Sequence, residues 1–253
     1  MVLPFYPDAR RTALFFDFDG TLVEIAERPD AVALADVTRS ALRTIARHAG
    51  GAVAIITGRD IATIDDFVSP LRLPIAGVHG FARRDAGGQL QIPEFDEGLL
   101  ERVKGELGAF SKAHAGLFVE SKAGSLALHY RARPELEGLC METMERVFAG
   151  ANGFALTLGK MVVEARPEGA NKGAAVMAFM SEAPFAGRAP LFAGDDVTDE
   201  DAFAAVNEAD GISIKVGEGA TAAQFRAPTT STFLNWLVSY AEHLEGAVDL
   251  ERT

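Results

Sequence analysis

Two carboxylates stand two positions apart in the string DFDGT, as Asp17 and Asp19. They close a short, aromatic-rich apolar run that starts at Ala13 and is typical of a buried strand leading into a loop. Carboxylates are costly to bury unless a cation or phosphate chemistry compensates for the lost hydration. Gly20 would let the chain turn tightly beside a ligand. The string therefore indicates a cation or phosphate site, with a solvated Asp-Gly turn as the plain alternative.

Two further strings carry groups that bind phosphate. Thr57 and Gly58 close the apolar run GAVAIIT, and their hydroxyl and amide N–H can both donate to a phosphate oxygen. Lys172, in the string NKG, stands at the start of a predicted helix. The helix dipole disfavours a positive charge at that end, and an anionic ligand bound there would compensate for it. Taken alone, the first string is also typical of an ordinary helix cap and the second of a solvated lysine.

A dense group of acids lies in the string GDDVTDED. Part of the group lies at the start of the following helix, where acidic side chains stabilise the helix through its dipole. These residues are Asp199, Glu200 and Asp201. Asp195 and Asp196 come too early for that role, directly after a buried apolar strand. Paired carboxylates in that position are typical of a hard-cation site built from oxygen ligands.

The elements that must position these residues alternate between strands and helices. The first third predicts strands over 13–18, 51–57 and 74–80, with helices over 36–48 and 61–68. Continuous apolar runs are typical of strands that are covered on both faces, as in a parallel sheet. The pattern therefore indicates a layered α/β fold, in which ligands bind beyond the carboxyl ends of the strands.

The middle of the chain has a different pattern. Two strand pairs and two helices predict an antiparallel sheet with helices, and hence a separate lobe over about 83–165. The parallel pattern resumes after this lobe. The core domain is therefore expected to be discontinuous, with its two halves over 1–82 and 166–253.

The strings DFDGT, TGR, NKG and GDDVTDE occur in this order over most of the chain. In that combination the sequence resembles the haloacid dehalogenase (HAD) superfamily of aspartyl phosphatases. The resemblance implies an α/β fold with a Rossmann-like parallel-sheet HAD core and an inserted α+β cap domain. In such enzymes the cap closes over the active site as a lid.

The resemblance also implies roles for the four strings. Asp17 attacks phosphorus and becomes an aspartyl-phosphate, and Asp19 protonates the leaving sugar oxygen and then activates water. Thr57 and Lys172 hold the transferring phosphoryl group, and Gly58 contributes to binding the substrate.

A Mg²⁺ cofactor follows from the same resemblance. Its expected ligands are Asp17, the backbone carbonyl of Asp19, and Asp195. Asp196 and Asp199 are expected to support these ligands or to bind the ion through water. An all-oxygen set of this kind suits a hard divalent cation.

The lobe contains the strings ESK, HYR and GKMVVEARP. In the first and the last of these strings an acid and a base stand two positions apart, as Glu120 and Lys122 do, so that on a strand both side chains point to the same face. Such pairs can bind sugar hydroxyls, and cross-strand ion pairing on a solvated sheet is the alternative. These strings are similar to the cap pattern of the trehalose-6-phosphate phosphatase family. The resemblance implies sugar contacts at Glu120, Lys122, Arg131, Lys160 and Glu164. One departure is Ala82, at a position where the family usually has an acid.

The expected reaction is hydrolysis of trehalose 6-phosphate to trehalose and phosphate, in trehalose biosynthesis. A HAD phosphatase for sucrose 6-phosphate or a glycosyl-3-phosphoglycerate is the nearest alternative. A phosphomutase and a non-catalytic sugar-phosphate sensor are more distant ones. A sensor would be expected to have lost Asp17, Asp19 or Lys172, and all three are present.

The 253 residues carry a formal net charge of -12, which disfavours nucleic acid and anionic membranes as partners. No apolar run approaches the ~20 residues that cross a bilayer, and the start MVLPFYPDARR lacks the apolar stretch of a secretory signal. Cys140 is the one cysteine, so an intramolecular disulfide and a multi-cysteine zinc site are excluded. We therefore expect a cytoplasmic enzyme whose partner is a small-molecule sugar phosphate.

Overall fold

The computed structural model describes residues 3–25, 32–93, 95–122, 124–151, 153–159 and 161–251. The chain divides into two compact units, of which the first comprises Met1–Gln91 and Asn171–Thr253 and the second Ile92–Ala170. The second unit begins at Ile92 rather than at 83 because the chain from Ala82 to Gln91 extends the sheet of the first unit. It ends at Ala170 rather than at 165, after its last strand has run on to Pro167.

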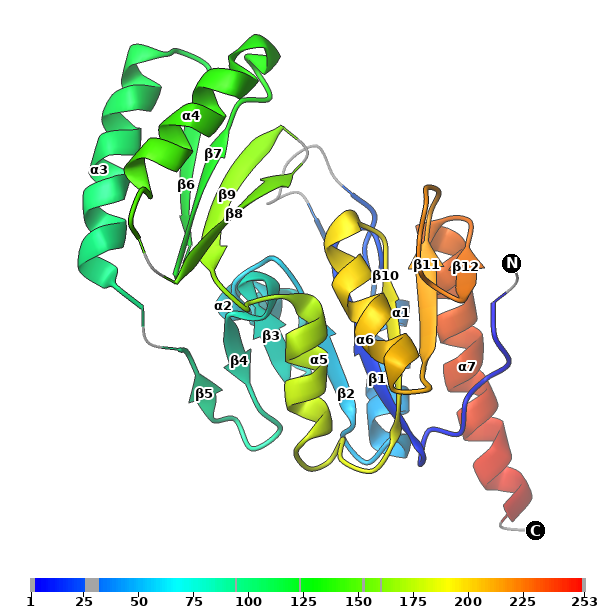
Figure 1. Cartoon of the computed structure of the whole chain (residues 1–253). Coiled ribbons are helices and arrows are strands. Elements are labelled where there is room, and N and C mark those ends of the chain that lie inside the picture. The colour runs from blue at the N-terminus through cyan, green and yellow to red at the C-terminus, as the bar shows by residue number, and fades with distance from the viewer. Residues whose placement is uncertain are drawn as a thin grey trace. The chain divides into compact units, whose positions relative to one another are not determined.

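Within the described residues, an eight-stranded sheet forms the centre of the first unit (Figure 1). Its strand order is β12-β11-β10-β1-β2-β3-β4-β5. Neighbouring strands from β12 to β3 are parallel, whereas β4 and β5 return antiparallel at the β3 edge. The bounds are β1 Thr12–Phe16, β2 Val53–Ile56, β3 Ile75–Gly77, β4 Ala82–Arg84, β5 Leu90–Gln91, β10 Ala189–Gly194, β11 Ile212–Val216 and β12 Phe225–Ala227.

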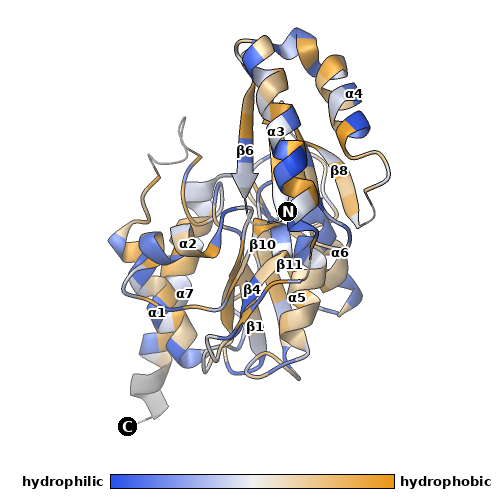
Figure 2. Cartoon of the chain, turned by 90° about the vertical axis from the view of Figure 1, so that its left-hand side faces the viewer, coloured by the Kyte–Doolittle hydropathy of each residue, from blue (hydrophilic) through white to orange (hydrophobic). Residues whose placement is uncertain are grey.

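Helices cover both faces of this sheet. Figure 2 shows the sheet nearly edge-on, with α1, α2 and α7 on one side and α5 and α6 on the other. The helices expected over 36–48 and 61–68 are confirmed as α1 and α2. The bounds are α1 Asp36–His48, α2 Ile61–Val68, α5 Lys172–Met180, α6 Glu200–Glu208 and α7 Thr230–Glu251, with short 3-10 turns at Val78–Gly80 and Val197–Asp199.

The core of the first unit lies between the helical layers. Every residue of β1 and β2 is buried, and both strands consist largely of apolar side chains. Phe15, Phe179 and Phe185 form an aromatic cluster with ring centroids 5.1–6.1 Å apart. This confirms the expectation of central strands covered on both faces, and burial of such apolar surface is the main force that stabilises the unit.

The second unit is an antiparallel sheet with helices α3 (Glu97–Ala113) and α4 (Glu137–Val147) packed on it (Figure 1). The strand order is β6-β7-β9-β8. The bounds are β6 Phe118–Lys122, β7 Ser125–His129, β8 Phe154–Gly159 and β9 Val162–Pro167. Leu126, Leu128 and Val163 share a core with α3 and α4. Residues at the alternate positions therefore lie on the sheet face away from these helices.

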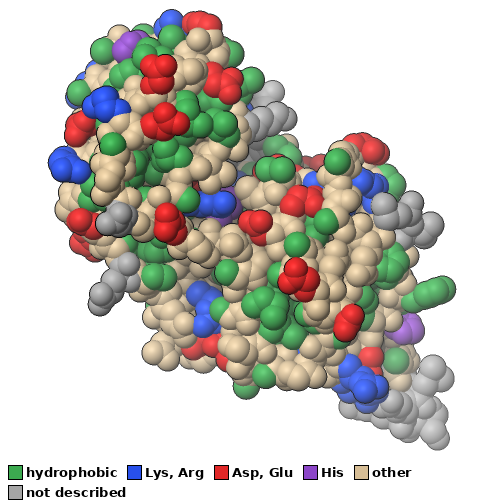
Figure 3. All heavy atoms as spheres, viewed as in Figure 1, with side chains coloured by type: hydrophobic (Ala, Val, Ile, Leu, Met, Phe, Trp, Pro, Cys, Tyr) green, Lys and Arg blue, Asp and Glu red, His purple; other side chains and the backbone are tan. Residues whose placement is uncertain are grey.

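The exposed side chains of the described residues include acidic, basic and large hydrophobic ones (Figure 3). No helix in the described part of the chain combines the length and apolar character needed to span a membrane. On the face that Figure 3 shows, acidic side chains are scattered over both units, and the coloured Lys and Arg side chains form no continuous patch.

Candidate active site

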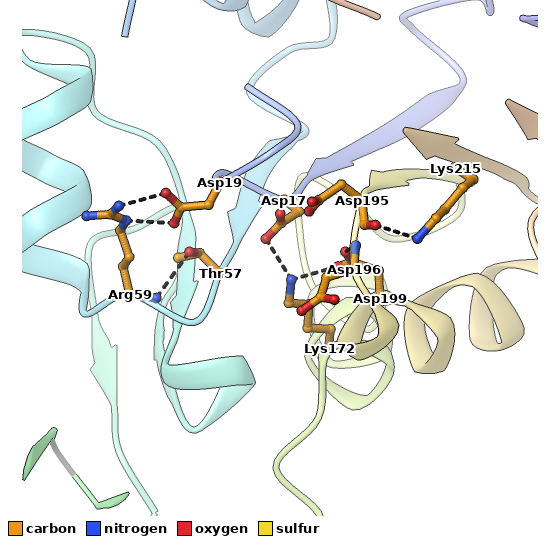
Figure 4. Close-up of polar contacts among 9 residues, drawn as sticks. All are labelled: Asp17, Asp19, Thr57, Arg59, Lys172, Asp195, Asp196, Asp199 and Lys215. Atoms are coloured by element: carbon orange, nitrogen blue, oxygen red, sulfur yellow. Dashed lines mark hydrogen bonds and ion pairs between the residues drawn. The ribbon is translucent and has the colours of Figure 1, made fainter. Parts of the chain in front are cut away.

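The predicted core residues stand at one edge of the parallel sheet. Asp17 follows β1, Thr57 follows β2, Asp195 follows β10, and Lys172 is the first residue of α5. The strands β10, β1 and β2 are parallel neighbours, so their carboxyl ends meet and the residues after them face a common space. The structure thus brings together the four strings that the sequence analysis singled out (Figure 4).

Lys172 joins two of these strings. Its Nζ donates to Oδ1 of Asp17 and to Oδ1 of Asp199, each at 2.6 Å. The lysine side chain is 3% exposed, and the two carboxylates are 6% and 0% exposed. Burial lowers the pKa of Lys172, but the charges of Asp17 and Asp199 outweigh burial and leave the pKa above its ordinary value. Lys172 therefore stays an ammonium, and the conflict with the helix dipole is resolved by acidic partners.

Three carboxylates converge beside this lysine. One oxygen each from Asp17, Asp195 and Asp199 lies within 4.8 Å of the others. Burial, followed by the charges of Asp199 and Asp195, holds the pKa of Asp17 well above its ordinary value, although Lys172 lowers it. Burial and the charges of Asp199 and Asp196 raise the pKa of Asp195 to about 6.

This donor set fits a hard divalent cation. Buried carboxylates that repel one another are compensated when a cation binds between them, and carboxylate oxygens are the ligands that Mg²⁺ prefers. Asp17 and Asp195 have carboxylate oxygens available for this purpose. Asp199 is already engaged, because its Oδ1 accepts from Lys172 and its Oδ2 accepts from the backbone N–H of Asp196 at 2.9 Å.

Asp196 lies outside the three-acid cluster found among the described residues. Its side chain accepts from the backbone N–H of Asp199, and the side chain of Asp199 accepts from the backbone N–H of Asp196. The two therefore form a capping box at the start of the turn before α6. This pair fixes the acidic loop. The expected role of Asp196 at the metal stays a prediction.

Two glycines of the site are required by close contacts. Gly20 has a φ of +79°, and a Cβ placed on it would lie 2.1 Å from Oδ2 of Asp195. A Cβ on Gly194 would lie 2.3 Å from Cγ of Asp199. The chain can therefore bring its acidic side chains this close to the backbone only because both positions lack a side chain.

Asp19 makes its strongest contact with Arg59. Nε of Arg59 donates to Oδ2 of Asp19 and one terminal nitrogen donates to Oδ1, both at 2.7 Å. The guanidinium lies 5.9 Å from the ring centroid of Phe18 and 5.2 Å from that of Phe67. The hydrogen bonds that Arg59 donates to Asp19 raise the pKa of Arg59. No role was expected for Arg59, although its position directly after Thr57 and Gly58 at a strand end was the available signal.

Thr57 is buried, and both its backbone and its hydroxyl are hydrogen-bonded. Its N–H donates to the carbonyl of Ala76 at 2.8 Å, and its Oγ1 accepts from the N–H of Arg59 at 3.1 Å. Because the hydroxyl oxygen accepts that bond, its own hydrogen can be directed at a phosphate oxygen. Gly58 packs against His79, whose Nε2 would lie 2.6 Å from a Cβ at that position.

Two of the expected sugar contacts lie together on the second unit. Glu120 and Glu164 are both paired with Ala127 in the strand register, so they share the sheet face away from the helices. Oε2 of Glu120 lies 2.9 Å from Nε2 of His129, and Oε1 of Glu164 accepts from Ser125 at 3.4 Å. The structure thus adds His129 as a partner of an expected sugar-binding acid.

The other expected sugar contacts are basic. Arg131 is exposed just beyond the end of β7. The side chain of Lys122 and the whole of Lys160 lie outside the described residues. Their expected roles stay predictions.

Comparison with known proteins gives a consistent result. The family model described as Trehalose-phosphatase matches residues 15–231. The chain is 41% identical over 225 residues to "Trehalose-6-phosphate phosphatase" of Escherichia coli (strain K12), covering 89% of this chain and 85% of that protein. It is 43% identical over 211 residues to "Probable trehalose-phosphate phosphatase" of Sinorhizobium fredii (strain NBRC 101917 / NGR234), covering 83% and 79%.

The fold has close counterparts among solved structures. The C-terminal domain of trehalose-6-phosphate phosphatase from C. albicans is similar with a TM-score of 0.81 at 24% identity, covering 92% of this chain and 93% of that one. At this identity the likeness establishes the α/β fold with its inserted lobe. The family match and the two relatives establish more, since they span most of the sequence. The chain therefore belongs to the trehalose-phosphatase family of the HAD superfamily.

Proposed function

We propose that this chain hydrolyses trehalose 6-phosphate to trehalose and inorganic phosphate through an aspartyl-phosphate at Asp17, with Mg²⁺ as cofactor. The observation that carries the chemistry is the buried pairing of Asp17 with Lys172, 2.6 Å apart, beside the carboxylate of Asp195. The substrate assignment is supported by the names of the relatives that span most of the chain.

In the first half-reaction, a carboxylate oxygen of Asp17 attacks phosphorus. A new oxygen–phosphorus bond forms on Asp17, and the bond between phosphorus and the sugar oxygen breaks. Asp19 gives its proton to the departing oxygen, which leaves as the neutral sugar hydroxyl. Lys172 and the hydroxyl of Thr57 stabilise the negative charge on the transferring group, which is the main requirement of phosphoryl transfer.

In the second half-reaction, Asp19 accepts a proton from water and the resulting nucleophile attacks the phosphoryl group on Asp17. The bond between Asp17 and phosphorus breaks, inorganic phosphate leaves and the carboxylate is restored. Asp19 thus regains the proton that it lost, and the cycle is balanced.

Asp17, the backbone carbonyl of Asp19, and Asp195 would hold Mg²⁺, which when bound neutralises charge on the phosphoryl oxygens and keeps Asp17 ionised. The residues around them serve this arrangement. Asp199 and Lys172 hold each other and Asp17 in place, and the capping pair of Asp196 and Asp199 fixes the loop that follows Asp195.

We assign sugar recognition to the second unit, as the cap domain of the enzyme. Glu120 and Glu164 offer carboxylate oxygens on one sheet face, and such groups accept hydrogen bonds from sugar hydroxyls. Arg131, Lys122 and Lys160 would add donors. Trehalose is neutral, so a balanced set of acids and bases suits it better than a strongly basic one.

The test is phosphate release from a panel of sugar phosphates in the presence of magnesium. Wild type is expected to release phosphate from trehalose 6-phosphate and little from sucrose 6-phosphate or glucose 6-phosphate. The Asp17→Asn variant should be inactive, and Asp66→Asn, which changes an exposed acid on α2, should retain activity. Acid quench and mass spectrometry of wild type during turnover should show a phosphorylated peptide that contains Asp17.

The outcomes separate the parts of the proposal. Release from a different sugar phosphate that is still lost in Asp17→Asn would retain the aspartyl chemistry and overturn the substrate assignment. A folded protein that releases phosphate from none of these substrates would overturn the whole proposal and favour a sugar-phosphate sensor.

A further inference from the structure

Lys215 is a buried cation to which the proposed mechanism gives no role. It lies on β11 with 4% of its surface exposed. Its Nζ donates to the backbone carbonyl of Asp195 (Figure 4). Burying an ammonium group is costly unless nearby groups compensate, so its presence here calls for a reason beyond packing.

The position of Lys215 places it behind the acidic loop. In the parallel pairing of β10 with β11, Lys215 lies opposite Gly194, the residue directly before Asp195. Gly194 has no side chain of its own with which to fix the backbone there, and a Cβ on it would collide with Asp199. The neighbouring strand supplies a group that holds the chain one residue further on, at the peptide between Asp195 and Asp196. Nζ of Lys215 binds the carbonyl of this peptide, and its N–H donates to Oδ2 of Asp199.

Asp195 is consequently held at two points. Its carbonyl accepts from Lys215, and its Oδ2 lies against the backbone of Gly20, 2.1 Å from where a Cβ would stand. Lys215 binds the backbone carbonyl of Asp195, so the carboxylate oxygens of Asp195 can bind another partner. Lys172 differs in this respect, because it binds the carboxylates of Asp17 and Asp199 directly.

We propose that Lys215 is a positioning residue of the metal site, which holds the Asp195 backbone so that the Asp195 carboxylate faces Asp17. This inference rests on the proposed function, since it assumes that Asp195 is a metal ligand. Groups that orient metal ligands from behind typically contribute about 10–100-fold to metal affinity.

A positioning role and a purely electrostatic role of Lys215 predict opposite changes in metal affinity when the lysine is removed. Removing a positive charge next to a cluster of carboxylates should strengthen the binding of a divalent cation by Coulomb attraction. Losing the anchor of the Asp195 backbone should weaken it, because the ligand is no longer pre-oriented. The sign of the change in affinity therefore tells the two roles apart.

The experiment measures Mn²⁺ binding to the purified full chain, by the electron paramagnetic resonance signal of free Mn²⁺. Wild type should bind, and Asp195→Asn should bind much more weakly. Lys215→Met is expected to raise the dissociation constant by about tenfold or more. Lys215→Arg, which keeps the charge and donor groups, should fall between Lys215→Met and wild type, and it is a second test if Lys215→Met folds poorly.

Ser213→Ala is the matched control. Ser213 lies two residues earlier on the same strand and face, and its Oγ donates to Asn207 rather than to the acidic loop. This variant should lower the melting temperature and leave Mn²⁺ affinity unchanged.

The outcomes keep this inference apart from the proposed function. Failure of wild type to bind Mn²⁺, or binding by Asp195→Asn equal to wild type, would overturn the proposed metal site. If those two behave as expected, an unchanged affinity in Lys215→Met with a lower melting temperature would show a purely structural lysine. Tighter binding would show a purely electrostatic one, and either result overturns the positioning role.

Discussion

The guanidinium of Arg59 and the carboxylate of Asp19 meet through two parallel hydrogen bonds, each 2.7 Å long. This bidentate geometry fixes the plane of the carboxylate as well as its distance. Arg59 is in turn packed beside Phe18 and Phe67 and is only 15% exposed. Each oxygen of Asp19 thus accepts one hydrogen bond, and the proton that Asp19 would give to a departing sugar oxygen has to occupy a remaining lone pair beside the Arg59 cation.

Arg59→Lys tests whether this pair matters for proton transfer. Lysine keeps the charge but cannot form the two-point contact. We expect kcat for trehalose 6-phosphate to fall roughly 10–100-fold, a fraction of the ~10²–10⁴-fold that a general acid contributes. Turnover of p-nitrophenyl phosphate should fall less in its first half-reaction, because p-nitrophenolate leaves without being protonated. Pre-steady-state release of p-nitrophenol measures that step.

Arg72→Lys is the control for this substitution, because Arg72 is 76% exposed and pairs only with Asp65 among the described residues. It should leave both rates unchanged. An equal loss on the two substrates in Arg59→Lys would point to phosphate binding rather than to a role at Asp19.

The local part of the site could be predicted from the sequence. Asp17, Asp195 and Lys172 each follow a buried strand or open a helix, and those features leave a pattern within about ten residues. The pair formed by Asp19 and Arg59 leaves no such pattern, because the two residues are 40 positions apart. Lys215 was missed for a related reason, since a lysine within ISIKV resembles any strand residue until the neighbouring strand is known.

The fold likewise has parts that local sequence signals predict and parts that depend on tertiary contacts. Helix α1 was expected over 36–48 and is observed there, because amphipathic periodicity and helix ends are local signals. Strands β4 and β5 were not expected, and the lobe was therefore placed too early. They are short, β4 contains two arginines, and they are strands only because the chain turns back to pair with β3. Such pairing depends on tertiary context rather than on propensity.

Gly20→Ala should damage both stability and metal binding. The new methyl group would meet Oδ2 of Asp195 and would force a non-glycine residue to a φ of +79°. The backbone strain alone costs about 1–3 kcal/mol. We expect a lower melting temperature and a higher Mn²⁺ dissociation constant than wild type.

Gly88→Ala separates strain from collision. Gly88 has a φ of +84°, and a Cβ on it would meet nothing within 4 Å. This variant should lose stability while binding Mn²⁺ as wild type does. Equal effects of the two variants on metal affinity would show that the contact with Asp195 is unimportant.

Asp17→Asn should stabilise the metal-free protein while abolishing activity. Burial and the nearby Asp199 and Asp195 hold the pKa of Asp17 well above its ordinary value. A carboxyl group whose pKa is raised on folding contributes stability when protonated and loses it as the pH rises, so the ionised form is destabilising at neutral pH. An amide removes that cost, and its oxygen can still accept from Lys172.

The measurement is thermal unfolding at neutral pH, first with EDTA and then with excess Mg²⁺. With EDTA, Asp17→Asn should melt a few degrees above wild type. With Mg²⁺ the order should reverse, because at about 100 times its dissociation constant a ligand adds ~2.7 kcal/mol to the stability of a protein that binds it. The same rise with Mg²⁺ in both proteins would contradict a role for Asp17 as a metal ligand.

His129→Asn tests the proposed sugar-binding face of the second unit. Nε2 of His129 lies 2.9 Å from Oε2 of Glu120, and its ring lies 5.8 Å from that of Phe118. Loss of this hydrogen bond leaves Glu120 less firmly held, and ordering such a side chain again on binding costs about 1–2 kcal/mol. KM for trehalose 6-phosphate should therefore rise about fivefold to thirtyfold by that estimate, with kcat little changed. Turnover of p-nitrophenyl phosphate, which has no sugar, should be unaffected.

The control for this variant is His114→Asn, directly after α3 in the same unit. There Nδ1 lies 3.0 Å from the carbonyl oxygen of Phe110, and the ring lies beside the Phe110 ring. Its effect should be limited to stability, with KM for trehalose 6-phosphate as in wild type. A rise in KM in both histidine variants would indicate general loosening of the second unit. A rise in KM confined to His129→Asn would show that His129 acts through Glu120, and it would identify this sheet face as the one that binds the sugar.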